Sequence, residues 1–442
     1  MNKVSAILSH DYLQSKAVDA KFFRRSSKIT PAIFFEILLY SGAHFGNFSL
    51  QQFCNQTLKL FGIEVSKQAF DDRITDNAVS FVKSVFEDLM KNQTQKSFDL
   101  NLFTPFNRVK IRDSTKFKVD KSLRPEFKGF GKESLASACL QFEYDFKTGD
   151  MLELDIVAGS KADRDIAKER AHKIQKNDLD IYDLGYYDTS IFLKTHQAGA
   201  FFLSRLHTTS DVYDSPQGNK IDFDVHYKKM IKNQIKSMEM NVYIGTKERF
   251  EVRLILDILP DHIYEERIRK KAIRSKENGK ELTDRNRLRS RFNLLITNIQ
   301  KDVVPLENVY KLYRVRWQIE LLFKVWKCTY GINRVHKMNK YRLRCLLYAK
   351  LILLLINGML INQVNASIYQ PNKRVLSVAK CHTTLFIHLA ETIRYLCHAT
   401  NKGLLFFKSI AQMLSRNHDL EKRKDRQSII DILQLFAYKS NN

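Results

Sequence analysis

Two aspartates stand where this sequence should bury hydrophobic side chains. Asp113 lies in phase with Ile111 on the apolar side of an alternating run, and Asp183 lies in phase with Ile181 in a second run. Because burying an unpaired carboxylate is costly, each needs an arginine, backbone donors or a metal ion as its partner. One such aspartate is usually structural, but two of them in strands of one predicted sheet indicate a shared site.

A third carboxylate, Glu320, belongs to a predicted long helix over Leu306–Lys327. At about 100° per residue, one narrow stripe beside the apolar side of this helix carries four residues: Tyr313, Arg316, Glu320 and Lys327. The stripe can be a solvated face in which Arg316 and Glu320 form an i,i+4 pair, worth only a few tenths of a kcal/mol. Its position at the border of the apolar side also fits the wall of a cleft.

Three carboxylates without histidine or cysteine make a hard, all-oxygen ligand set. Such a set suits Mg²⁺ or Mn²⁺ and suits zinc poorly. Two such ions can activate a water or a 3′ hydroxyl and stabilise the leaving oxygen of an in-line phosphoryl displacement. With lysine and arginine beside them to hold phosphates, Asp113, Asp183 and Glu320 predict metal-dependent cleavage or transfer of DNA strands.

The composition agrees with a polyanionic partner. The 442 residues contain 73 Lys or Arg against 48 Asp or Glu, a formal net charge of +25, and the isoelectric point is near 9.6. A hydrophobic content of 44% excludes global disorder, and only 15 Gly and 7 Pro favour long helices over a collagenous or low-complexity chain. The length suggests about three domains.

The cysteines and the apolar segments favour an intracellular protein. The six cysteines form no CxxC pair, as expected for thiols in a reducing compartment. Residues 1–28 contain no apolar run typical of a signal peptide. The most apolar stretch, Leu346–Ile361, is shorter than a membrane span requires and contains Lys350 and Asn357. We therefore expect a soluble cytoplasmic protein without a membrane partner.

The first hundred residues look helical. Thr30-Pro31 opens one helix, Ser49 caps another over Leu50–Phe61, and Ser66 caps a third after a break at Gly62. A short helix, a glycine turn and a capped helix outline a helix-turn-helix, although a small helical bundle fits the same spacing.

The segment from Phe106 to Leu206 predicts a mixed sheet. Alternation in the first run puts Asp113 and Phe117 on one face and Lys110 and Arg112 on the other. Further strands are expected over 137–145, 151–157, 179–184 and 200–206, with a helix over Ala162–Lys176. Residues 207–291 interrupt this plan with two strand-like runs and the basic stretch Arg267–Arg291. A strand over Leu294–Ile299 then precedes the Glu320 helix.

The stripe also matches a family signature. Tyr313-x-x-Arg316-x-x-x-Glu320-x6-Lys327, in the context YRVRWQIELLFKVWK, resembles the signature of the insertion-sequence-four family of bacterial DDE transposases. IRDSTKF around Asp113 and IYDLGYYD around Asp183 resemble the two aspartate strands of that family, and LLITNI resembles the strand before its signature helix. The resemblance runs from about residue 30 to 360, with three specific blocks.

The resemblance implies a fold, a reaction and roles for residues. It implies a ribonuclease-H-like core with a mostly β insertion, between helical N- and C-terminal regions. Asp113, Asp183 and Glu320 would hold two Mg²⁺ or Mn²⁺ ions, and five residues would contact DNA: Tyr313, Arg316, Trp317, Lys324 and Lys327. The family excises its element by cut-and-paste chemistry through a DNA hairpin, as a dimer bound to two terminal inverted repeats. We therefore expect a homodimer that acts on terminal repeats and target DNA in the bacterial nucleoid.

Five parts of the chain follow from this interpretation. They are a helix-turn-helix-like DNA-binding domain (1–100), the first part of the core (101–206), a mostly β insertion with a basic segment (207–291), the second part of the core with the signature helix (292–335), and a helical C-terminal region available for dimerisation (336–442).

Several alternatives stay open. Asp188 is a rival to Asp183 as a ligand, and Tyr243 or Phe250 could replace the insertion aromatic with which the family receives a flipped base. Cys381, His382 and nearby residues match no common zinc spacing. The other candidate functions are a different nuclease of the same fold, such as a junction resolvase, and a catalytically inactive DNA-binding regulator descended from a transposase.

Overall fold

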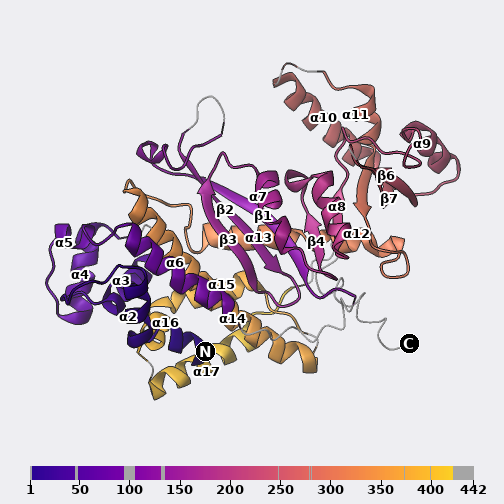
Figure 1. The fold of residues 1–442 in the computed structure, drawn as a ribbon. Helices are drawn as coiled ribbons and strands as arrows, with labels where there is room; N and C mark the ends of the chain where they lie inside the picture. Colours follow the sequence, from indigo (N-terminus) through magenta and orange to yellow (C-terminus); the bar gives the residue numbers. More distant parts are fainter. Residues whose placement is uncertain are drawn as a thin grey trace. The chain divides into compact units, whose positions relative to one another are not determined.

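The computed structural model describes residues 2–44, 48–93, 105–130, 135–246, 248–277, 279, 281–372, 374–398 and 400–421. These residues form two compact units (Figure 1). One unit takes in the described residues of Met1–Leu100, Ser114–Lys161 and Gln318–Ile430. The other takes in those of Asn101–Asp113 and Ala162–Trp317.

The N-terminal region is helical, as the sequence predicts. The bounds of its helices are α1 Asn2–Ile7, α2 His10–Asp19, α3 Pro31–Ala43, α4 Leu50–Phe61, α5 Lys67–Asp71 and α6 Asp76–Lys91. Of these, α3, α4 and α5 begin where the sequence predicts them. Thr30 and Ser49 cap α3 and α4 through their hydroxyls, and Gly62 ends α4 in the left-handed conformation at φ 66°. The third predicted helix is a single short turn, α5, because the chain turns again before α6.

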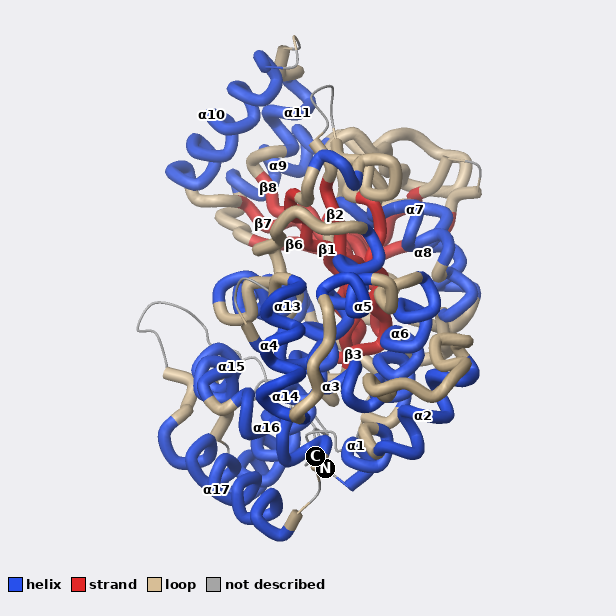
Figure 2. Tube along the Cα trace, turned by 90° about the vertical axis from the view of Figure 1, so that its left-hand side faces the viewer, coloured by secondary structure: helices blue, strands red, loops and turns tan. Residues whose placement is uncertain are grey.

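A long buried helix organises the same unit. α14 (Lys340–Asn372) packs against α3, α6 and α17 (Asn401–Asn417), and α15 (Val378–Ile387) and α16 (Leu389–Cys397) complete the helical region (Figure 2). Within the described residues, α14 is the one helix long and apolar enough to cross a membrane, and 89% of its most apolar window is buried inside the protein. Such burial is typical of a core helix.

Eight strands form one mixed sheet in the order β3-β2-β1-β4-β5-β8-β7-β6. Their bounds are β1 Val109–Lys118, β2 Ser137–Asp145, β3 Met151–Ala158, β4 Leu179–Tyr182, β5 Phe201–Arg205, β6 Ser237–Ile244, β7 Phe250–Ile258 and β8 Phe292–Thr297. β1, β4 and β5 are parallel, whereas β2–β3 and β6–β7–β8 are antiparallel. This sheet between helical ends confirms the predicted mixed fold with a ribonuclease-H-like core.

Between β5 and β8, the predicted mostly β insertion also contains helices. α9 (Phe223–Lys232), α10 (Asp261–Glu277) and α11 (Asp284–Arg289) accompany β6 and β7. The two strands continue the sheet next to β8, and a buried apolar cluster that includes Val242, Leu254 and Ile296 joins them to β5. The basic stretch therefore lies mainly on helices. Its dense Lys and Arg residues leave α10 without a buried residue.

Two predicted helices are shorter than expected. The helix predicted over Ala162–Lys176 is α7 (Asp163–Glu169) followed by the single turn η3 (Ala171–Lys173). The helix predicted over Leu306–Lys327 is divided into α12 (Leu306–Arg314) and α13 (Trp317–Cys328). The N–H groups of Val315 and Arg316 bond the carbonyls three residues back instead of four. A tighter 3₁₀-type turn therefore separates the two helices at the signature arginine.

Candidate active site

Asp113 and Asp183 come from adjacent parallel strands. β1 pairs with β4 so that Ile111 stands opposite Ile181, and the same register continued by two residues brings Asp113 level with Asp183. The side chains are partly exposed, 19% for Asp113 and 37% for Asp183. The apolar residues before them on the same face of β1 and β4 are buried. The two carboxylates thus stand where a buried strand face opens to solvent.

Arg316 bridges the two aspartates. Its Nη1 lies 3.5 Å from Asp113 Oδ2 and its Nε lies 3.8 Å from Asp183 Oδ1. The residue is buried, with 8% of its surface exposed. Both aspartates therefore have a cationic partner, which removes much of the penalty for their position. Arg316, whose DNA contact stays a prediction, thus contacts the carboxylates themselves.

Tyr313 supports the end of β4. Its hydroxyl donates a hydrogen bond to the carbonyl of Tyr182, at 3.2 Å, one residue before Asp183. Burial raises the pKa of Tyr313 to about 12, so the phenol keeps its proton at neutral pH. The guanidinium of Arg205 lies 5.5 Å from the centre of its ring. Tyr313, predicted as a DNA contact, is thus mainly buried against the aspartate strand.

The remaining signature residues lie on α13. Trp317 at its first position is 56% exposed and Lys324 is exposed, whereas Glu320 and Lys327 are half-buried. Glu320, Lys324 and Lys327 belong to the compact unit that also contains α14. Asp113, Asp183, Tyr313 and Arg316 belong to the other unit, in which the contacts described above hold them together.

Asp188, the rival to Asp183, is a helix cap. Its carboxylate accepts hydrogen bonds from the backbone N–H and the hydroxyl of Ser190 at the start of α8 (Thr189–Gln197) and pairs with Lys168 at 3.1 Å. Burial raises the pKa of Asp188, but the bonds from Ser190 and Lys168 outweigh this effect and lower it. Its partners are those of a structural aspartate, which favours Asp183 as the ligand.

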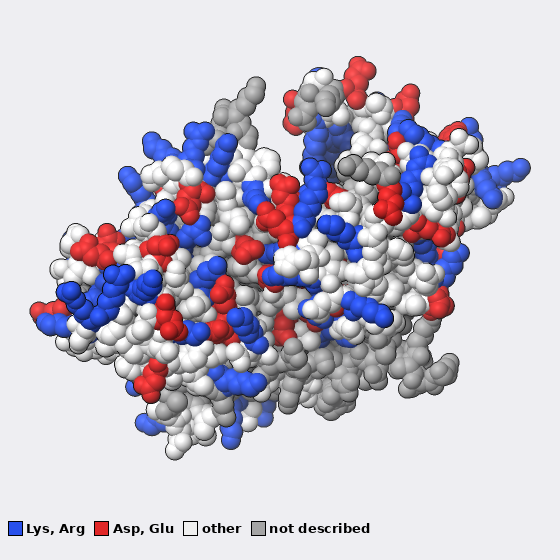
Figure 3. Space-filling model, viewed as in Figure 1, with Lys and Arg blue, Asp and Glu red and all other residues white. Residues whose placement is uncertain are grey.

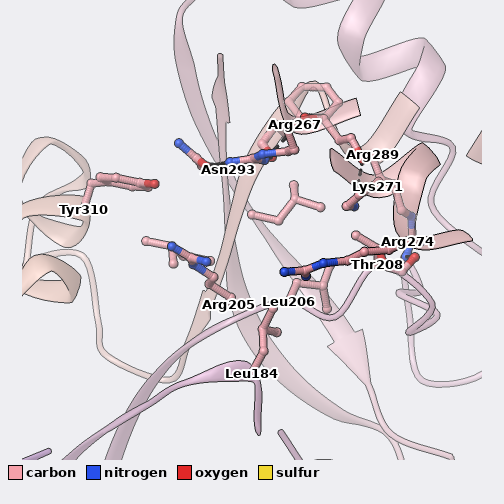
Figure 4. A pocket seen from close by; sticks show the side chains of 14 residues that line it. Leu184, Arg205, Leu206, Thr208, Arg267, Lys271, Arg274, Arg289, Asn293 and Tyr310 are labelled. Carbon is pink, nitrogen blue, oxygen red and sulfur yellow. Dashed lines mark hydrogen bonds between the residues drawn. The ribbon is translucent and has the colours of Figure 1, made fainter. Parts of the chain in front are cut away.

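A cation-lined pocket begins at the residue after Asp183. This pocket, of about 300 Å³, has Leu184 in its wall (Figure 4). Its basic lining residues come from β5, α10 and α11: Arg205, Arg267, Lys271, Arg274 and Arg289. None of the lining residues is acidic within the described part of the chain. On the face drawn in Figure 3, Lys and Arg side chains gather along α10 and α11.

Two of these arginines build the pocket wall. Arg267 donates to the Phe292 carbonyl at 2.8 Å and to Asn293 Oδ1 at 2.7 Å, and Arg289 donates to the Thr208 carbonyl at 2.8 Å. Burial, with Arg205 nearby, lowers the pKa of Arg267, and burial with Arg285 nearby lowers that of Arg289 to about 10. The pocket therefore concentrates like charges that a polyanion would neutralise.

The basic helices of this pocket were visible in the sequence, but its strand residue was not. The stretch Arg267–Arg291 has a dense charge pattern that indicates phosphate contacts. Arg205 is a single arginine at the end of β5, and only the fold brings it beside α10. Nothing in its local sequence could have found it.

The residues present suit hard divalent ions. Among the described residues, no group of three or more His, Cys, Asp or Glu side chains forms a ready metal cage. Asp113 and Asp183 nevertheless offer carboxylate oxygens at corresponding strand positions beside solvent, and such donors fit Mg²⁺ or Mn²⁺. The residues of the alternative zinc cluster are dispersed: His382 contacts Tyr330, and His398 contacts Glu36.

The aromatic residues considered for a flipped base differ in exposure. Phe250 is buried and packs against His196 and Phe202, so its ring serves the core. Tyr243 is half-buried in β6, and its backbone pairs with Tyr213. Phe292 and Tyr310 are the aromatic residues that line the cationic pocket.

Comparisons with known proteins show the family of the chain. The family model described as "Transposase DDE domain" matches residues 104–356, more than half of the chain. The transposase for insertion sequence element IS1151 of Clostridium perfringens is 28% identical over 96% of this chain and 93% of the relative. The transposase for insertion sequence element IS231B of Bacillus thuringiensis subsp. berliner is 26% identical over the same shares.

A solved structure aligns along most of the chain. The piggyBac transposase in a synaptic complex with hairpin DNA superimposes with a TM-score of 0.46 at 10% identity, covering 96% of this chain and 87% of that one. The family match and the relatives that align along most of their length identify the reaction class as phosphoryl transfer on DNA. The chain belongs to the transposase DDE domain family, as an insertion-sequence DDE transposase of the insertion-sequence-four family.

Proposed function

We propose that this transposase binds the terminal inverted repeats of its own element, cuts there in a metal-dependent reaction and transfers the ends to target DNA. Asp113, Asp183 and Glu320 are the proposed ligands of two Mg²⁺ or Mn²⁺ ions. The observation that carries the proposal is the pair Asp113 and Asp183, one in β1 and the other directly after the adjacent parallel strand β4, with Arg316 between them and the cationic pocket starting at Leu184.

The protein side of the reaction consists of holding charges in place. When bound, the metal ions would activate the attacking hydroxyl and stabilise the leaving oxygen. Arg316 keeps the two aspartates beside each other and places a positive charge where phosphate charge develops. Tyr313 holds the carbonyl before Asp183. The pocket cations hold the phosphates of the strand that approaches Asp183.

The exposed part of the signature helix supports the DNA contacts. Trp317 presents an exposed ring at the start of α13, suited to stacking on a base beside the cut. Lys324, which is exposed, and Lys327 offer charges to phosphates. The proposal includes a cut-and-paste route through a DNA hairpin, carried out by a homodimer bound to two inverted repeats. It also includes the five-part organisation of the chain given above. We place its site of action at bacterial chromosomal DNA.

The experiment is cleavage of a DNA that carries the element's own ends, with Mg²⁺ or Mn²⁺, by the native protein and by Glu320→Gln. We expect cleavage by the native protein only, with equal binding of the ends by both proteins, because the substitution removes a ligand charge without changing size. Native cleavage products that include a closed hairpin would support the hairpin route.

Other outcomes identify the rival functions. Equal cleavage by both proteins would remove Glu320 from the site. End binding without cleavage by either protein would favour a regulator that has lost catalysis. Cleavage of branched DNA in preference to the repeats would favour a junction nuclease of the same fold.

A further inference from the structure

A network of buried charges lies behind the two aspartates. On the opposite face of β1 and β4, four side chains with only 1–2% exposure contact one another: Lys110, Arg112, Asp178 and Asp180. Lys110 Nζ lies 3.3 Å from Asp178 and 3.2 Å from Asp180, and Arg112 Nη2 lies 3.3 Å from Asp180. The sequence predicts Lys110 and Arg112 on a polar face, and the structure buries both of these residues.

Such a network is a poor way to gain stability. Desolvation of buried ions offsets most of their attraction, so apolar residues of similar size are often as stable. The best-attested use of buried polar groups is to select one register among several. The position of this network suggests that use here, because it spans the two strands that carry Asp113 and Asp183.

The apolar face of these strands constrains their register only in part. Val109 and Ile111 pair with Leu179 and Ile181. A shift of two residues keeps every side chain on its own face and still pairs one aliphatic residue of β1 with one of β4. The same shift moves Asp113 about 7 Å along the strand from Asp183, at about 3.3 Å per residue. A metal ion could not then bind both carboxylates.

The charged face does distinguish the registers. In the observed register Lys110 stands opposite Asp180 and lies within reach of both aspartates. A two-residue shift in one direction would place Lys110 opposite Tyr182 and Arg112 opposite Leu184, away from the acidic residues. A shift in the other direction keeps Lys110 and Arg112 opposite acidic residues, but it places Arg108 opposite Lys176 instead of Asp178, with which it now pairs. Arg112 also donates to the hydroxyl of Tyr182, at 3.4 Å, and lies over its ring. The residue before Asp183 is therefore tied to β1.

We propose that Lys110, Arg112 and Asp180 are positioning residues that fix the register of β1 and β4 and so hold Asp113 and Asp183 at metal-binding distance. This inference rests on the proposed metal-ligand role of the two aspartates. On this inference, the buried charges raise the affinity of the site for metal ions, and this role is separate from any effect on folding.

The test replaces the ion pair by apolar residues of similar size, Lys110→Met with Asp180→Leu. The Kd for Mn²⁺ is measured by electron paramagnetic resonance on the full-length protein bound to end DNA. Thermal midpoint and end binding without metal are measured in parallel. We expect a folded protein with native end binding and Mn²⁺ affinity 10–100-fold weaker, the range found when groups behind metal ligands are removed. Cleavage should recover as Mn²⁺ is raised.

A single substitution and a matched control complete the experiment. Arg112→Met leaves the Lys110–Asp180 pair intact, so it tests the proposal even when the double variant does not fold, with about tenfold weaker Mn²⁺ binding expected. Arg253→Met breaks the buried pair with Glu239 on β6 and β7, away from the aspartates, and should keep native Mn²⁺ affinity.

The outcomes separate this inference from the proposed function. Native Mn²⁺ affinity in folded Arg112→Met or in the folded double variant overturns the positioning role. Loss of affinity in Arg253→Met as well overturns it too, because the effect then follows general destabilisation. Native Mn²⁺ affinity in Asp113→Asn would instead overturn the ligand assignment itself.

Discussion

Neutralising two cations of the pocket tests whether DNA enters it. Arg205 and Arg274 line the pocket with exposed side chains, whereas Arg267 and Arg289 bond the backbone of its wall. Substituting Arg205→Gln and Arg274→Gln together therefore removes two positive charges and leaves those wall bonds in place. The expected effect is a weaker dependence of end binding on salt.

The size of the effect follows from counterion release. Each neutralised phosphate contributes about 0.9 to the slope of log affinity against log salt for duplex DNA, and about 0.7 for a single strand. Two lost contacts lower the slope by about 1.8 or about 1.4. Between about 50 and 200 mM salt, the native protein should lose about 12-fold more affinity than the variant for duplex, or about 7-fold more for a single strand.

The assay is fluorescence anisotropy of a labelled end duplex at several KCl concentrations without divalent metal. The control, Lys229→Gln with Lys232→Gln, removes the same charge from exposed positions of α9. An unchanged slope in the Arg205 and Arg274 variant would refute the placement of phosphates in the pocket. The same fall in the control would show that only net charge matters.

Three further substitutions test buried groups. His382→Gln replaces a buried histidine whose pKa is lowered by burial to about 3. Below pH 6.5 the histidine is protonated in the unfolded chain but stays neutral in the folded chain. The free energy of unfolding of the native protein should therefore fall by about 1.4 kcal/mol per pH unit towards pH 3. Urea unfolding at pH 7.0 and 5.5 should show a smaller fall in the variant, and equal falls would contradict the assignment. Lys350→Met replaces a lysine whose pKa is lowered by burial to about 8. Above pH 8 this lysine loses its proton in the folded chain but keeps it in the unfolded chain. The stability of the native protein should therefore rise relative to that of the variant up to about pH 10.5. Parallel thermal melts at pH 7.5 and 9.5 check this, and a constant difference would argue against it. Tyr313→Phe removes the hydrogen bond to the Tyr182 carbonyl and should cost about 1 kcal/mol of stability in urea unfolding, with unchanged affinity for end DNA; weaker binding of end DNA by the folded variant would mean that this hydroxyl contacts phosphate after all.

The aspartate positions could be predicted because strand alternation is local information. Asp113 and Asp183 share the phase of their buried neighbours, and the structure puts Asp113 in β1 and Asp183 directly after the paired strand β4. Their role as metal ligands, with Glu320, stays a prediction. The burial of Lys110 and Arg112 could not be predicted, because alternation separates two faces without telling whether both are covered.

The break in the signature helix also depends on tertiary contacts. The 100° periodicity holds for Tyr313, Arg316 and Glu320 in either a continuous or a divided helix. The tight turn at Val315 and Arg316 accompanies the bonds of Tyr313 to Tyr182 and of Arg316 to the aspartates. Those partners lie more than a hundred residues earlier in the chain, so no local pattern specifies them.

The packing of α14 also bears on how the protein is made. α3 and α6 pack on this helix, and Gly42 approaches it so closely that a Cβ there would lie 3.2 Å from the backbone nitrogen of Lys350. A ribosome must therefore pass residue 372 before the N-terminal helices find their partner. Chains that end before α14 would lack the helix on which α3 and α6 pack. On the proposed DNA-binding role of residues 1–100, such chains should compete poorly with the complete enzyme for transposon ends. An element with this architecture would control its mobility through the amount of full-length protein.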